Sequence, residues 1–188
     1  MAPRIGVLAL QGGFAPHKQA LEELGLASSE VRTAAELAGL AGLVLPGGES
    51  TTQLRLLGRH GLEAALDAFV RSGRPVLCTC AGLILAAHKV SSPTQRSFGW
   101  LDLSVARNAW GRQVDSFIAS DDRDRLQLVF IRAPRIVEVG PQVEVLATYK
   151  GEPVLVRQGS IYGATFHPEL TPDRSIHQAV FGGQGLPA

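Results

Sequence analysis

The chain has 188 residues, of which 45% are hydrophobic and 19% charged, and its formal net charge is +1. This length and composition allow a buried core without disulfide or metal staples, which excludes a disordered chain and a disulfide miniprotein. The near-zero charge argues against a nucleic-acid or anionic-membrane partner. The 21 glycines and 11 prolines favour a fold with many tight turns over a helical bundle.

The first half of the chain alternates short apolar runs with helical patterns. Strands are predicted at residues 4–10, 30–32, 42–45 and 75–79. Helices are predicted at residues 16–24, from a capping box at 33–36, and at 51–57, 62–71 and 81–89. Because the strands are continuously apolar, this alternation predicts a parallel sheet with helices on both faces.

The second half is richer in strand patterns. Strands are predicted at residues 101–105, 113–117, 126–131, 143–148, 153–157 and 161–166, with a hairpin turn at 149–152. A last helix is predicted at 174–180, before a glycine-rich tail. Because no linker, repeat or low-complexity segment interrupts the chain, residues 1–188 are predicted to form one α/β domain with an antiparallel extension.

The apolar runs are too short for membrane segments. The longest covers only residues 76–87, whereas a spanning helix needs about 20 apolar residues. The run at residues 5–10 is too brief for the core of a signal peptide, so we expect a cytoplasmic protein. The two cysteines, Cys78 and Cys80, are then expected to stay reduced, and their spacing is not that of a C-x-x-C redox pair.

Cys80 lies where a predicted strand ends and a predicted helix begins, directly before Ala81-Gly82. A nucleophile on such a sharp turn projects above the sheet and needs small neighbours. The N-terminus of the helix stabilises a thiolate, and its free N–H groups can hold an oxyanion. Cys80 is therefore a candidate nucleophile. A buried structural cysteine is the alternative interpretation, and it is the one we adopt for Cys78.

The segment Phe166-His167-Pro168-Glu169 follows the last predicted strand. It could supply the base and the orienting group that a nucleophilic thiol needs, because the Glu169 carboxylate can hold one ring nitrogen of His167. In open α/β sheets ligands bind at the carboxyl ends of the strands, so His167 and Cys80 are expected to meet there. Taken alone, the segment is more typical of an ordinary strand-end turn with a solvated glutamate.

The remaining histidines have no such company in the sequence, and we assign them no catalytic role: His17, His60, His88 and His177. His88 is predicted to interact with the C-terminal end of its helix. No spacing of histidines, cysteines or carboxylates indicates a metal site.

A glycine-rich loop at residues 46–52 ends the third predicted strand at the same edge. Gly47 and Gly48 allow a substrate to approach the backbone closely, and a glycine N–H can point at an oxyanion. A phosphate-binding or merely tight turn is the alternative, but the chain has no G-x-x-x-x-G-K-[ST] motif that would support nucleotide binding.

Several of these segments together resemble the class I glutamine amidotransferases and, within them, the glutaminase subunits of pyridoxal 5'-phosphate synthase. The segments are residues 5–12, 45–52, 107–117, 130–134 and 166–170. Cys-x-Gly with His-Pro-Glu is typical of the superfamily, whereas Gly-Gly-Glu-Ser-Thr-Thr and Arg-Asn…Gly-Arg-Gln-x-Asp-Ser-Phe are specific to the branch. The resemblance extends to about Leu170 and implies a three-layer, flavodoxin-like fold with a mostly parallel sheet.

By this resemblance Cys80 is the nucleophile, His167 the acid/base and Glu169 the group that orients His167. The N–H groups of Gly48 and Ala81 would form the oxyanion hole. The glutamine-binding positions of the family fall on Gly48, Glu49, Ser50, Arg107, Ile131 and Arg132. The resemblance implies no cofactor and no metal, and the family usually has glycine where this chain has Cys78.

The implied reaction is attack of the Cys80 thiolate on the side-chain amide of glutamine, release of ammonia and hydrolysis of the thioester to glutamate. The implied partner is a synthase subunit that makes pyridoxal 5'-phosphate from ammonia and sugar phosphates. Two alternatives remain open. One is the glutaminase of another synthase, against which residues 111–117 argue, and the other is a catalytically silent binding protein, against which the intact Cys80, His167 and Glu169 argue.

Overall fold

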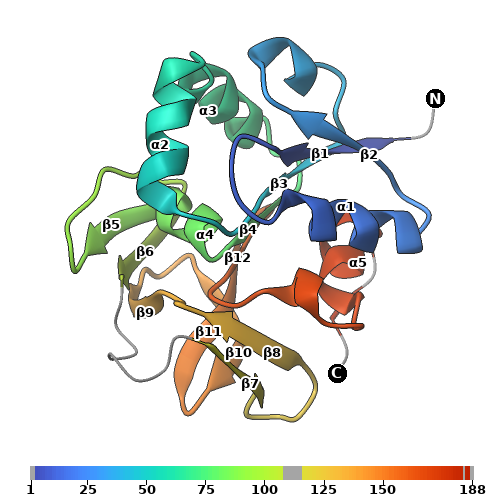
Figure 1. The fold of residues 1–188 in the computed structure, drawn as a ribbon. Helices are drawn as coiled ribbons and strands as arrows, with labels where there is room; N and C mark the ends of the chain where they lie inside the picture. Colours follow the sequence, from blue (N-terminus) through green and yellow to red (C-terminus); the bar gives the residue numbers. More distant parts are fainter. Residues whose placement is uncertain (1–2, 108–115, 184, 187–188) are drawn as a thin grey trace.

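A seven-stranded sheet runs through the middle of the molecule in this computed structural model, which describes residues 3–107, 116–183 and 185–186 (Figure 1). Its strands are β1 (Arg4–Leu8), β2 (Ala27–Val31), β3 (Gly42–Leu45), β4 (Val76–Thr79), β10 (Glu144–Tyr149), β11 (Glu152–Gln158) and β12 (Ile161–Ala164). Their spatial order is β10-β11-β12-β4-β3-β1-β2.

The strand directions divide this sheet into two parts. The neighbours from β12 through β4, β3 and β1 to β2 are all parallel. β11 and β10 continue the sheet in antiparallel pairing, and the hairpin between them turns at Lys150-Gly151. The predicted α/β class, a mostly parallel sheet with an antiparallel extension, is therefore confirmed.

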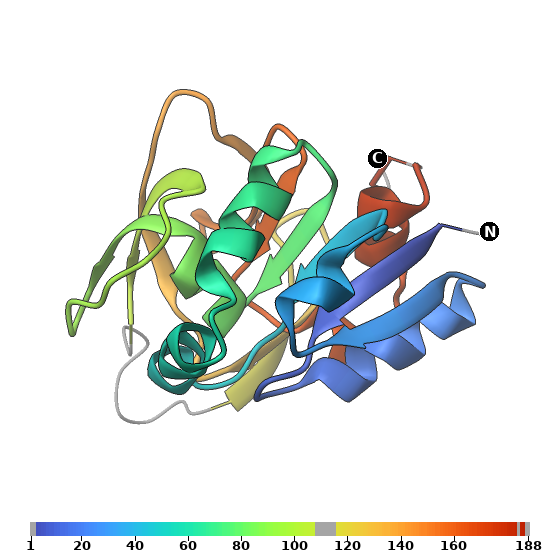
Figure 2. The same cartoon turned by 90° about the horizontal axis from the view of Figure 1, so that it is seen from above.

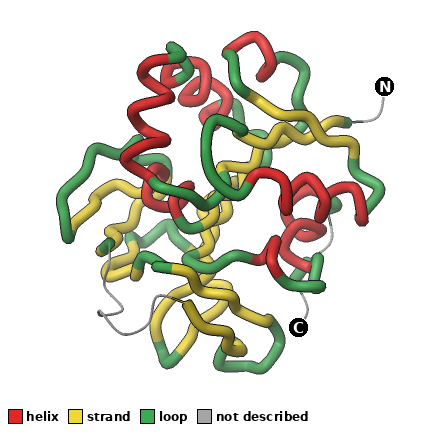
Figure 3. Tube along the Cα trace, in the orientation of Figure 1, coloured by secondary structure: helices red, strands yellow, loops and turns green. Residues whose placement is uncertain are grey.

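Helices cover both faces of the parallel part (Figure 3). α1 (Phe14–Glu23) and α5 (Ser175–Phe181) pack on one face. α2 (Ser50–Arg59), α3 (Glu63–Arg71) and α4 (Ala81–Ala86) pack on the other. Two 3-10 turns complete the set, η1 (Ala34–Leu37) and η2 (Pro168–Leu170), and the Glu36 carboxylate accepts the Thr33 N–H of the predicted capping box at 2.8 Å.

Two smaller sheets adjoin the main one. β5 (Ala87–Ser91), β6 (Leu101–Ala106) and β9 (Arg135–Val139) form the first, which lies on the opposite side of the molecule from β2 (Figure 2). β7 (Ser116–Ser120) and β8 (Gln127–Ile131) form an antiparallel pair. The part of the predicted strand at residues 113–115 lies outside the described residues.

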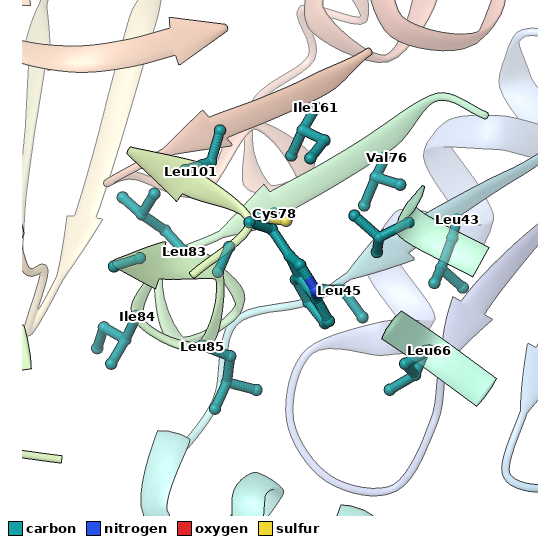
Figure 4. Packing of buried hydrophobic residues seen from close by; sticks show 14 of the residues in the cluster. Leu43, Leu45, Leu66, Val76, Cys78, Leu83, Ile84, Leu85, Leu101 and Ile161 are labelled. Atoms are coloured by element: carbon teal, nitrogen blue, oxygen red, sulfur yellow. The ribbon is translucent and has the colours of Figure 1, made fainter. Parts of the chain in front are cut away.

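The alternation of side chains along the strands builds two cores, one on each face. Leu43, Leu45 and Val76 point to the α2–α4 face and pack there with Cys78 (Figure 4). Val44 and Leu77, their neighbours in sequence, point to the α1–α5 face. All five side chains are fully or almost fully buried, which explains why these strands are continuously apolar.

One predicted helix is wrong in its last three residues. Residues 81–89 were expected to be helical, but α4 ends at Ala86, and β5 follows at once and pairs with β6. An apolar run this short does not distinguish helix from strand by its period, and pairing with a distant strand decides it. His88 therefore lies exposed in a strand rather than at a helix end, and the sequence analysis also missed β9.

Three neighbouring parallel strands, β12, β4 and β3, end at one edge of the sheet. His167 follows β12, Cys80 follows β4 and Gly47-Gly48 follow β3. The predicted meeting of these segments at the carboxyl edge is thus what the topology produces. Within the described part of the chain, no helix is long and apolar enough to cross a membrane.

Candidate active site

Cys80 occupies a strained turn between β4 and α4. Its backbone angles are φ 47° and ψ −101°, in the left-handed region that residues with a side chain rarely adopt. The Cys80 N–H donates to the Ala164 carbonyl of β12 at 2.8 Å, and its Sγ lies 3.9 Å from the Ile131 carbonyl oxygen. A Cβ on Gly82 would overlap the Leu45 carbonyl, so the turn needs its small neighbour. This geometry is typical of a nucleophile elbow.

His167 and Glu169 form a close buried pair beside this turn. His167 Nδ1 lies 2.7 Å from Glu169 Oε1, and the His167 N–H donates to the Val129 carbonyl of β8 at 2.8 Å. Burial opposes a charge on His167, but its contacts with Cys80 and Glu169 outweigh burial and raise its pKa to about 10. Burial likewise works against a charged Glu169, yet the hydrogen bond and the charge of His167 lower the pKa of this carboxyl. Glu169 is thus a carboxylate that holds a protonated His167.

The loop after β3 is fitted closely around this pair. A Cβ on Gly47 would overlap the His167 ring, so only glycine fits beneath it. The Gly47 carbonyl accepts the Gly13 N–H at 3.0 Å. Two glutamine side chains brace the loop from outside: Gln11 Oε1 accepts the Glu49 N–H at 2.9 Å, and Gln53 Nε2 donates to the Pro46 carbonyl at 3.2 Å.

These segments surround a cavity of about 270 Å³. Its size is near the lower end of the range of small-molecule pockets, about 300–1,000 Å³, and suits an amino acid better than a larger ligand. The predicted site residues that line it are Gly48, Glu49, Ser50, Cys80, Arg107, Ile131, Arg132, His167 and Glu169. Ala81 is buried and does not line the cavity, but its N–H belongs to the first turn of α4, where backbone N–H groups have no partner within the helix.

One wall of the cavity is a polar cluster around Arg107. Arg107 Nη1 donates to Gln95 Oε1 at 2.8 Å, and its Nη2 lies 3.5 Å from Glu49 Oε1. The Glu49 carboxylate also caps α2 by accepting the Thr51 and Thr52 N–H groups. Burial alone would raise the pKa of Glu49, and these hydrogen bonds lower it instead. Gln95, which the sequence analysis missed, therefore joins Arg107 to Ser50, whose hydroxyl donates to the same oxygen at 3.0 Å.

The end of β8 forms another part of the cavity wall. Ile131 is 36% exposed and presents its carbonyl to Cys80. Arg132 follows with φ 44° and is also exposed. Residues 108–115, which carry much of the branch-specific Arg-Asn…Asp-Ser-Phe segment, lie outside the described residues.

Two histidines to which the sequence analysis assigned no role, His17 and His177, lie close to Glu169 or to each other in the structure. His17 Nε2 lies 3.3 Å from Glu169 Oε2, and His17 Nδ1 lies 2.9 Å from His177 Nε2. Both histidines come from helices on the α1–α5 face, and His17, the one that approaches Glu169, is far from it in sequence. No local spacing could have revealed the contact. In the ranges that the structure describes, no group of three or more His, Cys, Asp or Glu residues forms a possible metal site.

Comparison with known proteins places the chain in a family. Residues 7–181 match the SNO glutamine amidotransferase family. A curated relative from Koribacter versatilis, named pyridoxal 5'-phosphate synthase subunit PdxT, is 51% identical over 93% of this chain and 92% of its own. A relative of the same name from Deinococcus radiodurans is 49% identical over 96% and 97%.

Solved structures give the same result. One described as a glutamine amidotransferase superposes with a TM-score of 0.88 and is 44% identical over 95% of this chain and 97% of its own. The structure of PurLQS from Thermotoga maritima, at 16% identity and a TM-score of 0.73 over 97% of this chain and 99% of that one, shows the shared fold alone. The resemblance predicted from the sequence is confirmed: the chain belongs to the SNO glutamine amidotransferase family.

Proposed function

We propose that this chain hydrolyses glutamine to glutamate and ammonia at Cys80 and delivers the ammonia to a synthase subunit that makes pyridoxal 5'-phosphate. The observation that carries the proposal is the line of Cys80, His167 and Glu169 at the edge of an amino-acid-sized cavity. The names of the curated relatives, subunits of pyridoxal 5'-phosphate synthase, support the pathway.

In this mechanism His167 carries the proton of the Cys80 thiol, and Glu169 stabilises the resulting imidazolium. The thiolate attacks the side-chain carbonyl carbon of glutamine, and the carbonyl oxygen becomes an oxyanion. His167 then gives its proton to the nitrogen of this tetrahedral intermediate, the C–N bond breaks, and ammonia leaves while the glutamyl group stays on Cys80 as a thioester. A water that loses a proton to His167 hydrolyses the thioester and releases glutamate, and the proton returns to the Cys80–His167 pair.

The backbone completes the site. The Ala81 N–H at the start of α4 and the Gly48 N–H are the proposed oxyanion donors, and such a donor contributes roughly 10²–10³ in rate. Arg107 and Arg132 are two arginines that line the cavity, and we assign them to the α-carboxylate of glutamine. Glu49 and Ser50 act beside Arg107, and Ile131 contacts the substrate from the end of β8.

The reactivity of the Cys80 thiol indicates the compartment in which the protein works. A nucleophilic thiol has to stay reduced, and Cys78 and Cys80 are free cysteines, so we propose that the protein works in the cytoplasm. We also propose that residues 1–188 act as one glutaminase domain with no cofactor. Its partner is the synthase subunit, with which it forms a hetero-oligomeric complex, rather than nucleic acid or a membrane.

The test is glutamate release at saturating glutamine by the full chain mixed with its synthase subunit. Wild type is expected to release glutamate and the Cys80→Ala variant to release none above background. A glutamine-analogue electrophile should label Cys80 and not Cys78, as read by peptide mass spectrometry. A wild-type complex that leaves both glutamine and the electrophile untouched would overturn the proposal, and co-purification with a different synthase would overturn its pathway.

A further inference from the structure

Two histidines approach Glu169, one at each carboxylate oxygen. Oε1 lies 2.7 Å from His167 Nδ1, and Oε2 lies 3.3 Å from His17 Nε2. The approach of His17 is at an ion-pair distance rather than in a hydrogen bond of good geometry, and Oε2 is buried without any hydrogen-bond partner within the described part of the chain. His17 is 0% exposed and Glu169 5%, so water does not compete at this oxygen.

His17 also contacts His177 and Thr79. Its Nδ1 lies 2.9 Å from Nε2 of His177, which is also 0% exposed. Its Nε2 lies 3.2 Å from the hydroxyl of Thr79, the last residue of β4 and the neighbour of Cys80. The contacts therefore tie α1, α5 and β4 to the turn that carries Glu169.

The protonation pattern of this group is determined by its surroundings. Burial lowers the pKa of His17 and brings that of His177 to about 3, so both rings are neutral at neutral pH. A neutral imidazole has one donor and one acceptor nitrogen, and a carboxylate oxygen only accepts. With its proton on Nε2, His17 presents a donor to Glu169 Oε2 and to the Thr79 hydroxyl, and its Nδ1 accepts from His177 Nε2–H.

The surroundings of His177 Nδ1 agree with this proton assignment. His177 Nδ1 is then an acceptor, and it is buried without a hydrogen-bond partner among the residues that the structure describes. The opposite tautomer of His17 would turn a lone pair toward Glu169 Oε2. It would also leave His177 Nδ1 as a buried N–H donor, and an orphaned donor of this kind is rare.

We propose that His17 is a positioning residue for the Cys80–His167–Glu169 site, with its Nε2–H holding the second oxygen of Glu169 and with His177 fixing its tautomer. A carboxylate held at one oxygen turns about its terminal torsion, which has broad minima. Held at both oxygens, it keeps the plane that orients the His167 ring toward Cys80. This inference rests on the proposed glutaminase function and adds a residue that the triad does not include.

Two amide substitutions separate this role from a general need for a polar group. In His17→Gln the terminal amide reaches the position of Nε2 and can still donate to Glu169. In His17→Asn the amide reaches only the position of Nδ1, so it can contact His177 but not Glu169. Both are measured as the full chain with its synthase subunit, by glutamate release against glutamine concentration and pH.

We expect His17→Asn to lower kcat about 10–100-fold, by analogy with groups that orient metal-binding histidines, with KM changed less than about twofold. Because a loosened Glu169 supports the His167 imidazolium less well, the alkaline limb of the pH profile should move to lower pH. His17→Gln should restore most of kcat and the wild-type limb. Equal kcat in both variants, or a loss in both with an unmoved limb, would overturn the proposal.

The controls keep folding and function apart. His60→Asn makes the same substitution at an exposed histidine, the C-cap of α2, and should change neither kcat nor the pH profile. If His17→Asn does not fold, His177→Leu replaces it and should give a loss of roughly 3–10-fold in kcat with the limb moved in the same direction. A folded His177→Leu complex with wild-type kinetics would refute the inference. An inactive wild-type complex would instead refute the glutaminase function itself.

Discussion

Cys78 lies in β4 and Cys80 directly follows the strand, with one residue between them, yet the first lies inside the core and the second at its edge. Cys78 pairs in register with Gly163 of β12 and Leu45 of β3, is 0% exposed, and burial raises its pKa so that it stays a neutral thiol. Cys80 sits on the strained turn that faces the cavity. The interior of β4 therefore carries packing and its carboxyl end carries chemistry, and substitutions should separate the two.

The largest difference is expected at Cys80. Cys80→Ala removes the nucleophile, and glutamine hydrolysis should fall by roughly 10⁵–10⁶, as for the loss of other covalent nucleophiles. The free energy of unfolding should barely change, because the side chain occupies the cavity edge. Glutamate release and urea unfolding, measured on the same preparation, check both parts. An active Cys80→Ala variant would invert our assignment of the two thiols.

Glu169→Gln should have the next largest effect. The amide is nearly isosteric but can turn its NH₂ group toward His167, and turnover should drop roughly 10²–10⁴-fold. The folded-state pKa of His167, about 10, lies above its ordinary value because Cys80 and Glu169 favour the imidazolium. Loss of the carboxylate lowers that pKa, so the alkaline limb of the rate profile should move to lower pH. Unchanged turnover in a folded variant would reduce Glu169 to a structural carboxylate.

The carboxyl edge of the sheet could be predicted from the sequence because each of its segments carries a local signal. Cys80 precedes small residues at a strand-to-helix boundary, His167 and Glu169 are two apart, and Gly47-Gly48 end a fully apolar strand. What the sequence missed depends on tertiary contacts. β5 is a strand because β6 lies beside it, and His17 meets Glu169 because α1 and η2 pack together.

The increase in glutamate release caused by the synthase subunit should be a smaller fold-change than the decrease caused by Cys80→Ala. The Gly47 carbonyl is bound to the Gly13 N–H, and the Gly47–Gly48 peptide can rotate at little steric cost only after that bond breaks. If docking of the synthase subunit turns the Gly48 N–H toward the oxyanion, glutamate release should rise about 10²–10³-fold, the contribution of one oxyanion donor. The comparison is turnover by the purified chain with and without stoichiometric synthase subunit. Equal rates would show that this loop is not gated.

The buried histidines behind the site should make stability depend on pH. The pKa of His177 is about 3 in the folded protein against 6.5 when exposed, and that of His17 is also lowered, in both cases because burial disfavours the charge. The unfolded chain therefore binds the protons, and stability should be lost as pH falls below about 6.5. Urea unfolding between pH 7.5 and 5 measures this slope. Most of this pH range lies above the pH at which carboxylates titrate, so histidines dominate the change in stability. His177→Leu should flatten the slope, and an identical slope in the variant would contradict the assignment.

Cys78→Gly should affect activity least. In contrast to Cys80→Ala, it should lower the free energy of unfolding and leave glutamine hydrolysis nearly unchanged. The substitution leaves a small cavity among Leu45, Val76 and Leu83 and loosens the strand, which together should cost about 2–3 kcal/mol of unfolding free energy. The Cys80 turn is held independently by the Ala164 carbonyl and by Gly82 against Leu45, so turnover should stay within about threefold of wild type. Cys78→Ala is the matched control, since it keeps the Cβ and should cost about half as much stability. A Cys78→Gly protein that folds but hydrolyses no glutamine would show that packing inside β4 sets the geometry of the turn, and the separation between core and edge would fail.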